Sequence, residues 1–69
     1  MNRAKQIRID KGYTLDHVSD ETGVSYRTLK KLEDGHVVNA PSGAAVGKFY
    51  GVQPSALYLP AEYDEKQAA

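Results

Sequence analysis

Residues 14–35 read TLDHVSDETGVSYRTLKKLEDG, and this stretch decides the fold. Its apolar residues recur three and four positions apart, which is the spacing of helices rather than the alternation of strands. Two short helices should therefore flank a turn at residues 23–25. Gly23 permits a sharp bend, Val24 fills the angle between the helices, and the Ser25 hydroxyl caps the second helix.

Helical spacing continues on both sides of this stretch, and glycines at positions 12, 23, 35 and 51 punctuate it. A glycine just past a helix adopts the left-handed conformation at little steric cost. The five expected helices cover about Asn2–Lys11, Thr14 to Gly23, Ser25 to Glu33 or Asp34, Ala40–Tyr50 and Pro54–Leu59. Their expected inward-facing residues are Ala4, Ile7, Leu15, Val18, Leu29, Leu32, Val46, Phe49 and Tyr50. We predict an all-α domain over residues 1–60 and a flexible C-terminal tail over 61–69.

The fourth helix is intrinsically weak, since Gly43 and Gly47 each destabilise it by about 1 kcal/mol relative to alanine. Asn39 can cap this helix, and Pro41 is tolerated in its first turn because no backbone donor is needed there. Tertiary packing must therefore hold the fourth helix in place.

The composition excludes several classes of protein. The 69 residues make one domain at most, and 41% apolar residues suffice for a packed core. The absence of cysteine excludes disulfides and thiolate metal sites, and His17 and His36 are too scattered for a structural zinc. No apolar run could span a membrane, and none follows the basic N-terminus as in a secretory signal. We expect a cytoplasmic protein of a bacterial host, of phage or mobile-element origin, that uses no cofactor.

The net charge of zero, from nine basic and nine acidic side chains, counts against nucleic-acid binding. The charges are unevenly distributed, however. Residues 1–60 carry eight basic and six acidic side chains, a net charge of +2, and the other acidic residues lie in the tail. Arg27, Lys30 and Lys31 form a basic cluster within the second helix of the deciding stretch.

Two helices joined by a tight glycine turn form a helix-turn-helix, which presents the second helix to the major groove of DNA. Over about residues 3–59 the chain resembles the Cro and phage-repressor (XRE-like) family of helix-turn-helix proteins. The resemblance rests on Gly12-Tyr13-Thr14, Thr22-Gly23-Val24-Ser25, Leu32-Glu33-Asp34-Gly35 and Gly51-Val52, in this order and at the family's spacing. It implies a five-helix, lambda-repressor-like DNA-binding domain.

The resemblance also implies which side chains read the bases. They lie at the start and on the exposed face of the recognition helix: Tyr26, Arg27, Lys30 and Lys31. The chemistry agrees, because arginine can donate paired hydrogen bonds to guanine O6 and N7, and lysine can reach the same acceptors. The alternative interpretation is a solvated helix face with no partner.

Phosphate contacts are implied near the N-termini of helices, where free N–H groups attract anions. The residues concerned are Thr14, Ser25, Thr28 and Asn39. Two features depart from the family. Leu15 replaces a glutamine that often contacts DNA, and residues 36–38 (His-Val-Val) stand where lysine or arginine often grips the phosphate backbone. We therefore expect a shallower salt dependence of binding than in more basic members.

Arg8 and Glu33 stand where the family pairs an arginine of its first helix with a glutamate at the end of its third. We expect a structural ion pair that fixes the recognition helix against the first helix. Removing one partner of such a pair is costly when the pair is buried.

Catalysis is not expected. His17 lies near Asp20 and Glu21 at helical spacing, but an exposed helix face is the better interpretation than a metal or acid–base site. No nucleotide-binding glycine loop is present, because Gly43 and Gly47 lie in a helical pattern with no strand before them. Tyrosines 13, 50, 58 and 63 are spread over separate elements, which favours packing over base stacking.

The expected partner is a double-stranded DNA operator, with no membrane involved. Small readers of this kind usually bind as symmetric dimers on two half-sites. The resemblance places the homodimer contacts at Pro54, Leu57, Tyr58 and Leu59. Alternatively, Leu57 and Leu59 complete the core, or the chains pair only on DNA.

The leading prediction is a sequence-specific, Cro-like transcriptional regulator that binds the major groove, with repression favoured over activation. One alternative is an antitoxin-type regulator whose tail over 61–69 binds a toxin. Another is a protein-interaction module that kept the fold but lost DNA binding. The zero net charge and the uncharged residues 36–38 support the last alternative, and the basic cluster opposes it.

Overall fold

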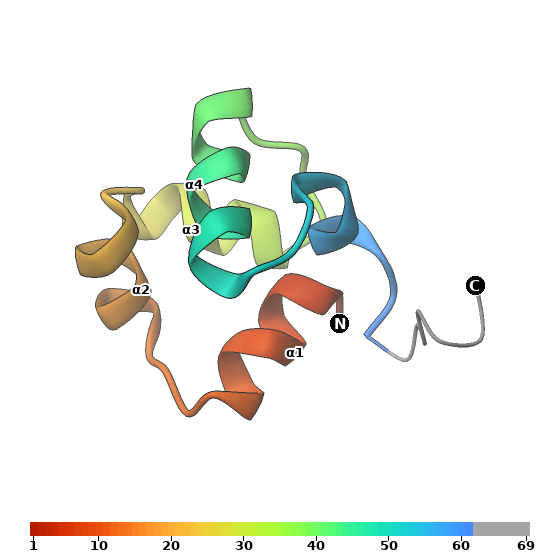
Figure 1. Cartoon of the computed structure of the whole chain (residues 1–69), viewed down its shortest axis with the longest axis horizontal. Helices are drawn as coiled ribbons and strands as arrows, with labels where there is room; N and C mark the ends of the chain where they lie inside the picture. Colours follow the sequence, from red (N-terminus) through yellow and green to blue (C-terminus); the bar gives the residue numbers. More distant parts are fainter. Residues whose placement is uncertain (62–69) are drawn as a thin grey trace.

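A computed structural model of the chain describes residues 1–61. Its helices are α1 (Arg3–Asp10), α2 (Leu15–Thr22), α3 (Tyr26–Glu33), α4 (Ala40–Tyr50) and the 3-10 helix η1 (Pro54–Tyr58). Figure 1 shows α2 on one side of α4 and the 3-10 helix on the other, with α1 below. The prediction of an all-α domain is confirmed. The expected tail lies, apart from Ala61, outside the described residues.

Each α-helix begins at a side chain that accepts a hydrogen bond from a backbone N–H three residues later. The capping residues are Asn2, Thr14, Ser25 and Asn39. A cap satisfies one of the amide donors that have no partner within the first turn. Three of these caps were expected, but Asn2 was placed inside the first helix. Asn2 and Lys11 instead flank α1, which is therefore shorter at both ends than predicted.

The short helix expected over Pro54–Leu59 is present at residues 54–58, and it is a 3-10 helix rather than an α-helix. Five residues are too few to offset the cost of starting an α-helix, and short 3-10 segments are a common alternative. No side chain caps this helix, and Leu59 already has extended backbone dihedral angles.

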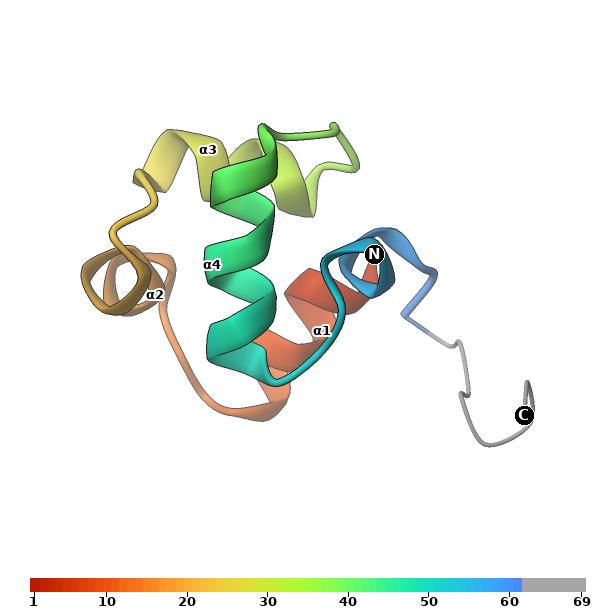
Figure 2. The same cartoon turned by 45° about the horizontal axis from the view of Figure 1, so that its top comes forward.

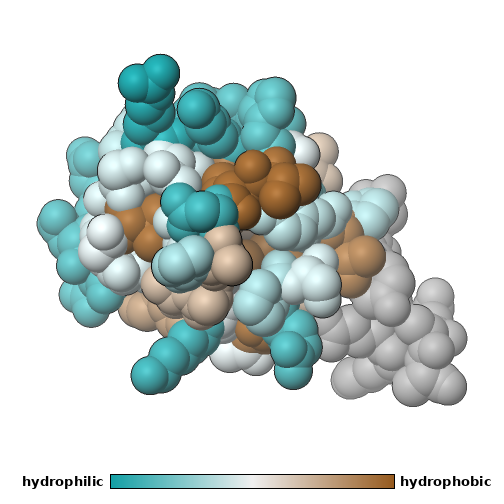
Figure 3. Space-filling view, turned by 90° about the horizontal axis from the view of Figure 1, so that it is seen from above, coloured by the Kyte–Doolittle hydropathy of each residue, from teal (hydrophilic) through white to brown (hydrophobic). Residues whose placement is uncertain are grey.

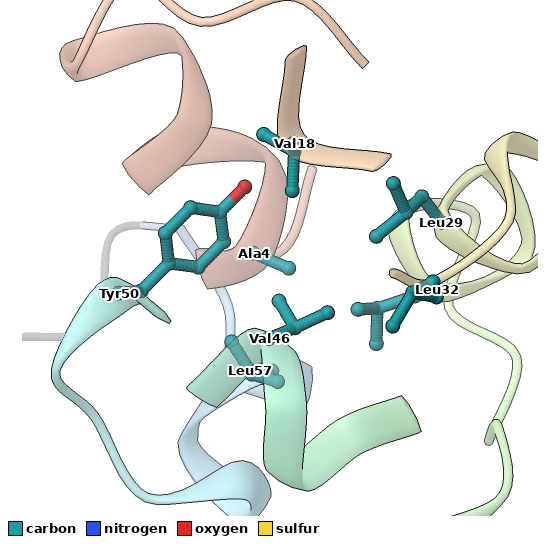
Figure 4. Packing of buried hydrophobic residues seen from close by; sticks show 8 residues of the cluster. Ala4, Val18, Leu29, Leu32, Val46, Tyr50 and Leu57 are labelled. Atoms are coloured by element: carbon teal, nitrogen blue, oxygen red, sulfur yellow. The ribbon is translucent and has the colours of Figure 1, made fainter. Parts of the chain in front are cut away.

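One hydrophobic core lies between the helices, and Figure 4 shows side chains from all five converging on it. Its buried members are Ala4, Val18, Val24, Leu29, Leu32, Val46, Tyr50 and Leu57. Six of the nine expected inward residues are among them, and Ile7, Leu15 and Phe49 are partly buried around them. Burial raises the pKa of Tyr50 to about 12, so its phenol stays protonated even near pH 10, where an exposed tyrosine is about half ionised.

The two ends of the described chain pair with each other. The Arg3 amide donates to the Leu59 carbonyl at 2.8 Å, and the Ala61 amide donates to the Met1 carbonyl at 3.1 Å. These bonds form a short antiparallel bridge between Asn2 and Pro60. In Figure 2 the N-terminus lies beside the segment that follows the 3-10 helix. The bridge therefore ties the start of α1 to residues 59–61.

Helix α4 and the segment that leads to η1 approach most closely at Gly47. A Cβ at Gly47 would lie 2.8 Å from the Val52 carbonyl oxygen and 3.3 Å from the Pro54 nitrogen. A Cβ at Gly43, one turn earlier, would lie 3.9 Å from its nearest neighbour, the Cβ of Pro54. Tertiary packing therefore holds this intrinsically weak helix at Gly47, whose missing side chain lets two backbones pack together.

Alanine substitutions at these two glycines should have opposite effects. Gly43→Ala should stabilise the protein by about 0.5–1 kcal/mol, because alanine is the better helix former. Gly47→Ala should destabilise it by about 1–3 kcal/mol, because α4 and the backbone at Val52 must move apart. Urea unfolding followed by circular dichroism measures both effects. A stabilising Gly47→Ala substitution would show that this close approach does not constrain the fold.

Candidate nucleic-acid interface

Helix α3 turns one side to the core and the other to solvent. Its two leucines are buried, whereas the four expected base readers are all exposed: Tyr26, Arg27, Lys30 and Lys31. Positions 26 and 30, like positions 27 and 31, are one helical turn apart, so the four form two neighbouring rows. We call this set of four residues the α3 surface. Figure 2 shows α3 along the upper edge of the molecule.

One lysine of the α3 surface already has a weak partner. The Lys30 Nζ lies 3.7 Å from Asp34 Oδ1, and both side chains are more than half exposed. Exposed pairs of this kind contribute at most about 0.5 kcal/mol. Lys30 can therefore exchange this carboxylate for another acceptor, although Asp34 places one negative charge beside the surface.

The expected phosphate-contacting residues lie at the starts of three helices. Thr14 Oγ1 accepts from the His17 amide at 3.1 Å, and Asn39 Oδ1 accepts from the Ser42 amide at 2.9 Å. Both caps are exposed, and the other first-turn amides retain the partial positive charge of a helix N-terminus.

At the start of α3, the capping residue engages Thr28 twice. Ser25 Oγ accepts from the Thr28 amide at 3.2 Å and donates to Thr28 Oγ1 at 2.9 Å. Ser25 is exposed, whereas Thr28 is half-buried. Both hydroxyl groups therefore have structural roles in the free protein that a phosphate contact would have to accommodate.

Arg8 and Glu33 form the expected ion pair between α1 and α3. Arg8 Nε donates to Glu33 Oε2 at 2.7 Å, its Nη2 donates to Oε1 at 3.1 Å, and its Nη1 donates to the Tyr13 carbonyl at 2.9 Å. The side chains are only 15% and 6% exposed. The hydrogen bond to Glu33 raises the pKa of Arg8 above its ordinary value. The arginine thus joins α1, the segment before α2 and the C-terminal end of α3.

A second polar link between α1 and α3 was missed by the sequence analysis. The Asn2 side chain is buried, and its Nδ2 donates to the Leu32 carbonyl at 2.7 Å. Asparagine is among the residues preferred at a helix N-cap, and this preference could have identified the cap. No local pattern could have identified an acceptor thirty positions away.

The four residues expected at a homodimer contact have different environments. Leu57 has no exposed surface, so it belongs to the core and cannot contact a second chain. Tyr58 is half-buried, and its hydroxyl accepts from the Val38 amide at 3.1 Å. Leu59 is half-buried as well, and Pro54 is exposed. A dimer contact in this region would therefore involve Pro54 and the exposed parts of Tyr58 and Leu59.

The connection between α3 and α4 contains the uncharged residues 36–38, and the structure shows which of their apolar side chains is exposed. Val37 is 84% exposed, more than any other large hydrophobic side chain in residues 1–61. Figure 3 looks onto the end of the molecule where α4 begins and shows hydrophobic patches on a largely hydrophilic surface. This connection is therefore suited to apolar contacts rather than to ionic ones.

His17 is exposed, as expected, and its ring lies near two aromatic rings. Its ring centroid lies 4.7 Å from that of Tyr13 and 6.5 Å from that of Phe49. Among the described residues, no three His, Cys, Asp or Glu side chains are grouped closely enough to hold a metal ion. His17 therefore lies on an exposed face of α2 with aromatic neighbours.

Comparisons do not place this chain in a known family. None of the helices in residues 1–61 has the length and apolar character needed to cross a bilayer. Searches of known protein families, of characterised proteins and of solved structures find no match for this chain.

Proposed function

We propose that the chain is a sequence-specific DNA-binding protein of the helix-turn-helix type that acts as a Cro-like transcriptional regulator. The observation that carries this proposal is the way in which α3 is held and the side chains that it exposes. One side of this helix is fixed to the core and to α1, while every side chain of the α3 surface is exposed. A rigidly seated helix with exposed arginine and lysine side chains suits the hydrogen-bond acceptors of the major groove.

The connection from α2 to α3 supports a helix-turn-helix. Gly23 closes α2 with a φ of 75°, Ser25 caps α3, and Val24 between them is buried. Helix α3 has eight residues, and an α-helix with its side chains is about 10–12 Å across, which fits the major groove, about 12 Å wide. The N-terminal half of α3, with Tyr26 and Arg27, would then face the base edges.

The remaining contacts would go to the DNA backbone. The capped N-termini of α2, α3 and α4 offer amide groups that attract phosphates. Such contacts need no basic side chain, which is consistent with a net charge of only +2 in residues 1–60. A dimer on two half-sites would raise the affinity of this weakly charged protein.

The proposal is tested by selecting duplexes from a random DNA library and then measuring binding of an Arg27 variant. Arg27→Ala should weaken binding to the selected duplex by about 1–3 kcal/mol, because the paired hydrogen bonds to one guanine are lost. Repeating the selection with this variant should relax the preference at one base pair. Fluorescence anisotropy at fixed salt concentration gives the affinities.

Two matched variants separate base reading from charge. Arg27→Lys keeps the charge but not the paired donors, so it should lose most of the same preference. Lys48→Ala removes one exposed positive charge from the last turn of α4 and should change affinity little. If Arg27→Ala lowered the affinity equally for every DNA sequence, Arg27 would contact a phosphate and would not read a base. No enriched duplex at low salt would refute the proposed function.

Exposed Val37 favours a second candidate function, a protein-interaction module on the same scaffold. Exposed apolar side chains in an uncharged connection suit a protein surface better than a phosphate backbone. An antitoxin-type regulator would combine both functions. The DNA selection distinguishes a DNA-binding protein from a pure protein-interaction module, since the latter would enrich no duplex.

A further inference from the structure

Asn2 uses both ends of its side-chain amide. Its Oδ1 accepts from the Lys5 amide at 3.1 Å, which caps α1, and its Nδ2 donates to the Leu32 carbonyl at 2.7 Å. A carboxylate or a hydroxyl of similar length can cap the helix as well. Asparagine is the short side chain that offers an amide donor and an acceptor together at neutral pH. Fewer side chains can therefore replace the one at position 2 than at an ordinary helix cap.

The backbone on both sides of Asn2 is held by the end of the domain. The Arg3 amide bonds to Leu59, and the Met1 carbonyl bonds to Ala61. The Asn2 carbonyl also accepts from the Gln6 amide in the first turn of α1. Because its backbone is fixed in this way, the Asn2 side chain reaches the C-terminal end of α3 from a fixed position.

Two neighbouring residues of α3 are thus linked to α1. Leu32 is held through Asn2, and Glu33 is held through Arg8. Leu32 also accepts from the Gly35 amide at 3.1 Å, so the Asn2 bond adds to the closure of the helix. Both attachments lie at the C-terminal end of α3, whose leucines also pack in the core, so together they restrict the movement of this end. Arg27 lies about 8 Å along the helix axis from the C-terminal end of α3, so a tilt of the helix displaces the Arg27 side chain.

We propose that Asn2 is a positioning residue that, together with Arg8, sets the orientation of α3. Asn2 touches no DNA in this proposal and acts through the seating of the helix. The expected effect of Asn2 on DNA binding rests on the proposed function, whereas its effect on the orientation of α3 does not. The two are therefore measured separately.

The Asn2→Asp variant separates the two bonds. Its carboxylate can still cap α1, but at neutral pH it has no proton to donate to Leu32 and faces the carbonyl oxygen with negative charge. Amide hydrogen exchange should become about tenfold faster at Gly35 and His36, the change that loss of one hydrogen bond of about 1.4 kcal/mol produces. Exchange at Val18 in α2 should change much less.

Two controls test the specificity of this effect. Asn39→Asp makes the same change at the exposed cap of α4, where the side chain bonds only within its own helix, and should leave exchange at the end of α3 unchanged. Lowering the pH should reduce the difference between Asn2→Asp and the native protein, because a protonated carboxyl group can again donate to Leu32. The native protein at each pH serves as the reference.

The outcomes are distinguishable from failure of the proposed function. If the native protein binds DNA, the Asn2→Asp variant should bind the selected duplex severalfold more weakly, because a displaced α3 moves Arg27 away from the base that it reads. Uniformly faster exchange across all helices, or no change at Gly35 and His36, would overturn the positioning role whatever the DNA result. Local loosening of α3 with full DNA affinity would overturn the link to base reading. If no duplex binds at all, the exchange data alone decide whether Asn2 positions α3.

Discussion

Arg8→Met should destabilise the protein by about 3 kcal/mol, because it leaves the carboxylate of Glu33 almost buried without its cation. It also removes the donor to the Tyr13 carbonyl. We expect the lower end of the range for buried pairs, since the Arg8 side chain retains 15% exposure. For a domain of this size the midpoint of thermal unfolding should fall by at least about 12 °C. Calorimetry, or circular dichroism during heating, measures this shift.

Three further variants show whether burial of the pair causes this loss. Glu33→Gln should cost less than Arg8→Met, because the amide oxygen can still accept from the arginine. The double variant should be more stable than the sum of the single losses predicts, since no uncompensated charge remains. Lys30→Ala breaks the exposed pair with Asp34 and should cost less than about 0.5 kcal/mol. Similar losses from Arg8→Met and Lys30→Ala would show that burial of the pair has no energetic consequence.

Leu57→Ala should cost about 2–4 kcal/mol, although the residue lies in a 3-10 helix of only five residues. Leu57 has no exposed surface and is one of the largest fully buried side chains of the described chain. Truncation removes buried methyl groups and leaves a cavity that the fold can close only in part. The matched variant is Leu59→Ala, which removes the same atoms from a half-buried position and should cost about 1 kcal/mol. Urea unfolding measures both losses.

The same variant separates a core position from a dimer contact. If Leu57 stabilises the single chain, the loss should be the same at low and high protein concentration. If it stabilises a dimer, the midpoint of unfolding should depend on concentration in the native protein, and this dependence should weaken in the variant. A loss that grows with protein concentration would contradict the burial of Leu57 in its own chain.

The features that local chemistry determines were predictable from the sequence. The caps at Thr14, Ser25 and Asn39 depend on residues within one turn, and four expected glycines adopt positive φ values. The exposed face of α3 follows from the spacing of Leu29 and Leu32. The pair of Arg8 and Glu33 was expected only through the resemblance to a family, because nothing local connects residues twenty-five positions apart.

The features that the sequence analysis missed depend on contacts between distant segments. Asn2 has a local role as a cap and a distant one at Leu32, and only the first has a sequence signature. Gly47 resembles Gly43 in sequence but lies against another backbone. Leu57 had two open interpretations because a short apolar segment fits a core or a surface equally well. The 3-10 geometry of η1 reflects its length and its position between prolines.

The bridge between residues 1–3 and 59–61 makes the folded chain nearly a closed ring. The two ends of the described residues lie within hydrogen-bonding distance of each other, so a short linker that joins Ala61 to Met1 in place of residues 62–69 would have almost no distance to span. A circularly permuted protein could then begin in the exposed segment between α1 and α2 without changing any helix. In such a protein α1 would follow η1 in the chain, and the residues that hold α3 would be made last during synthesis rather than first.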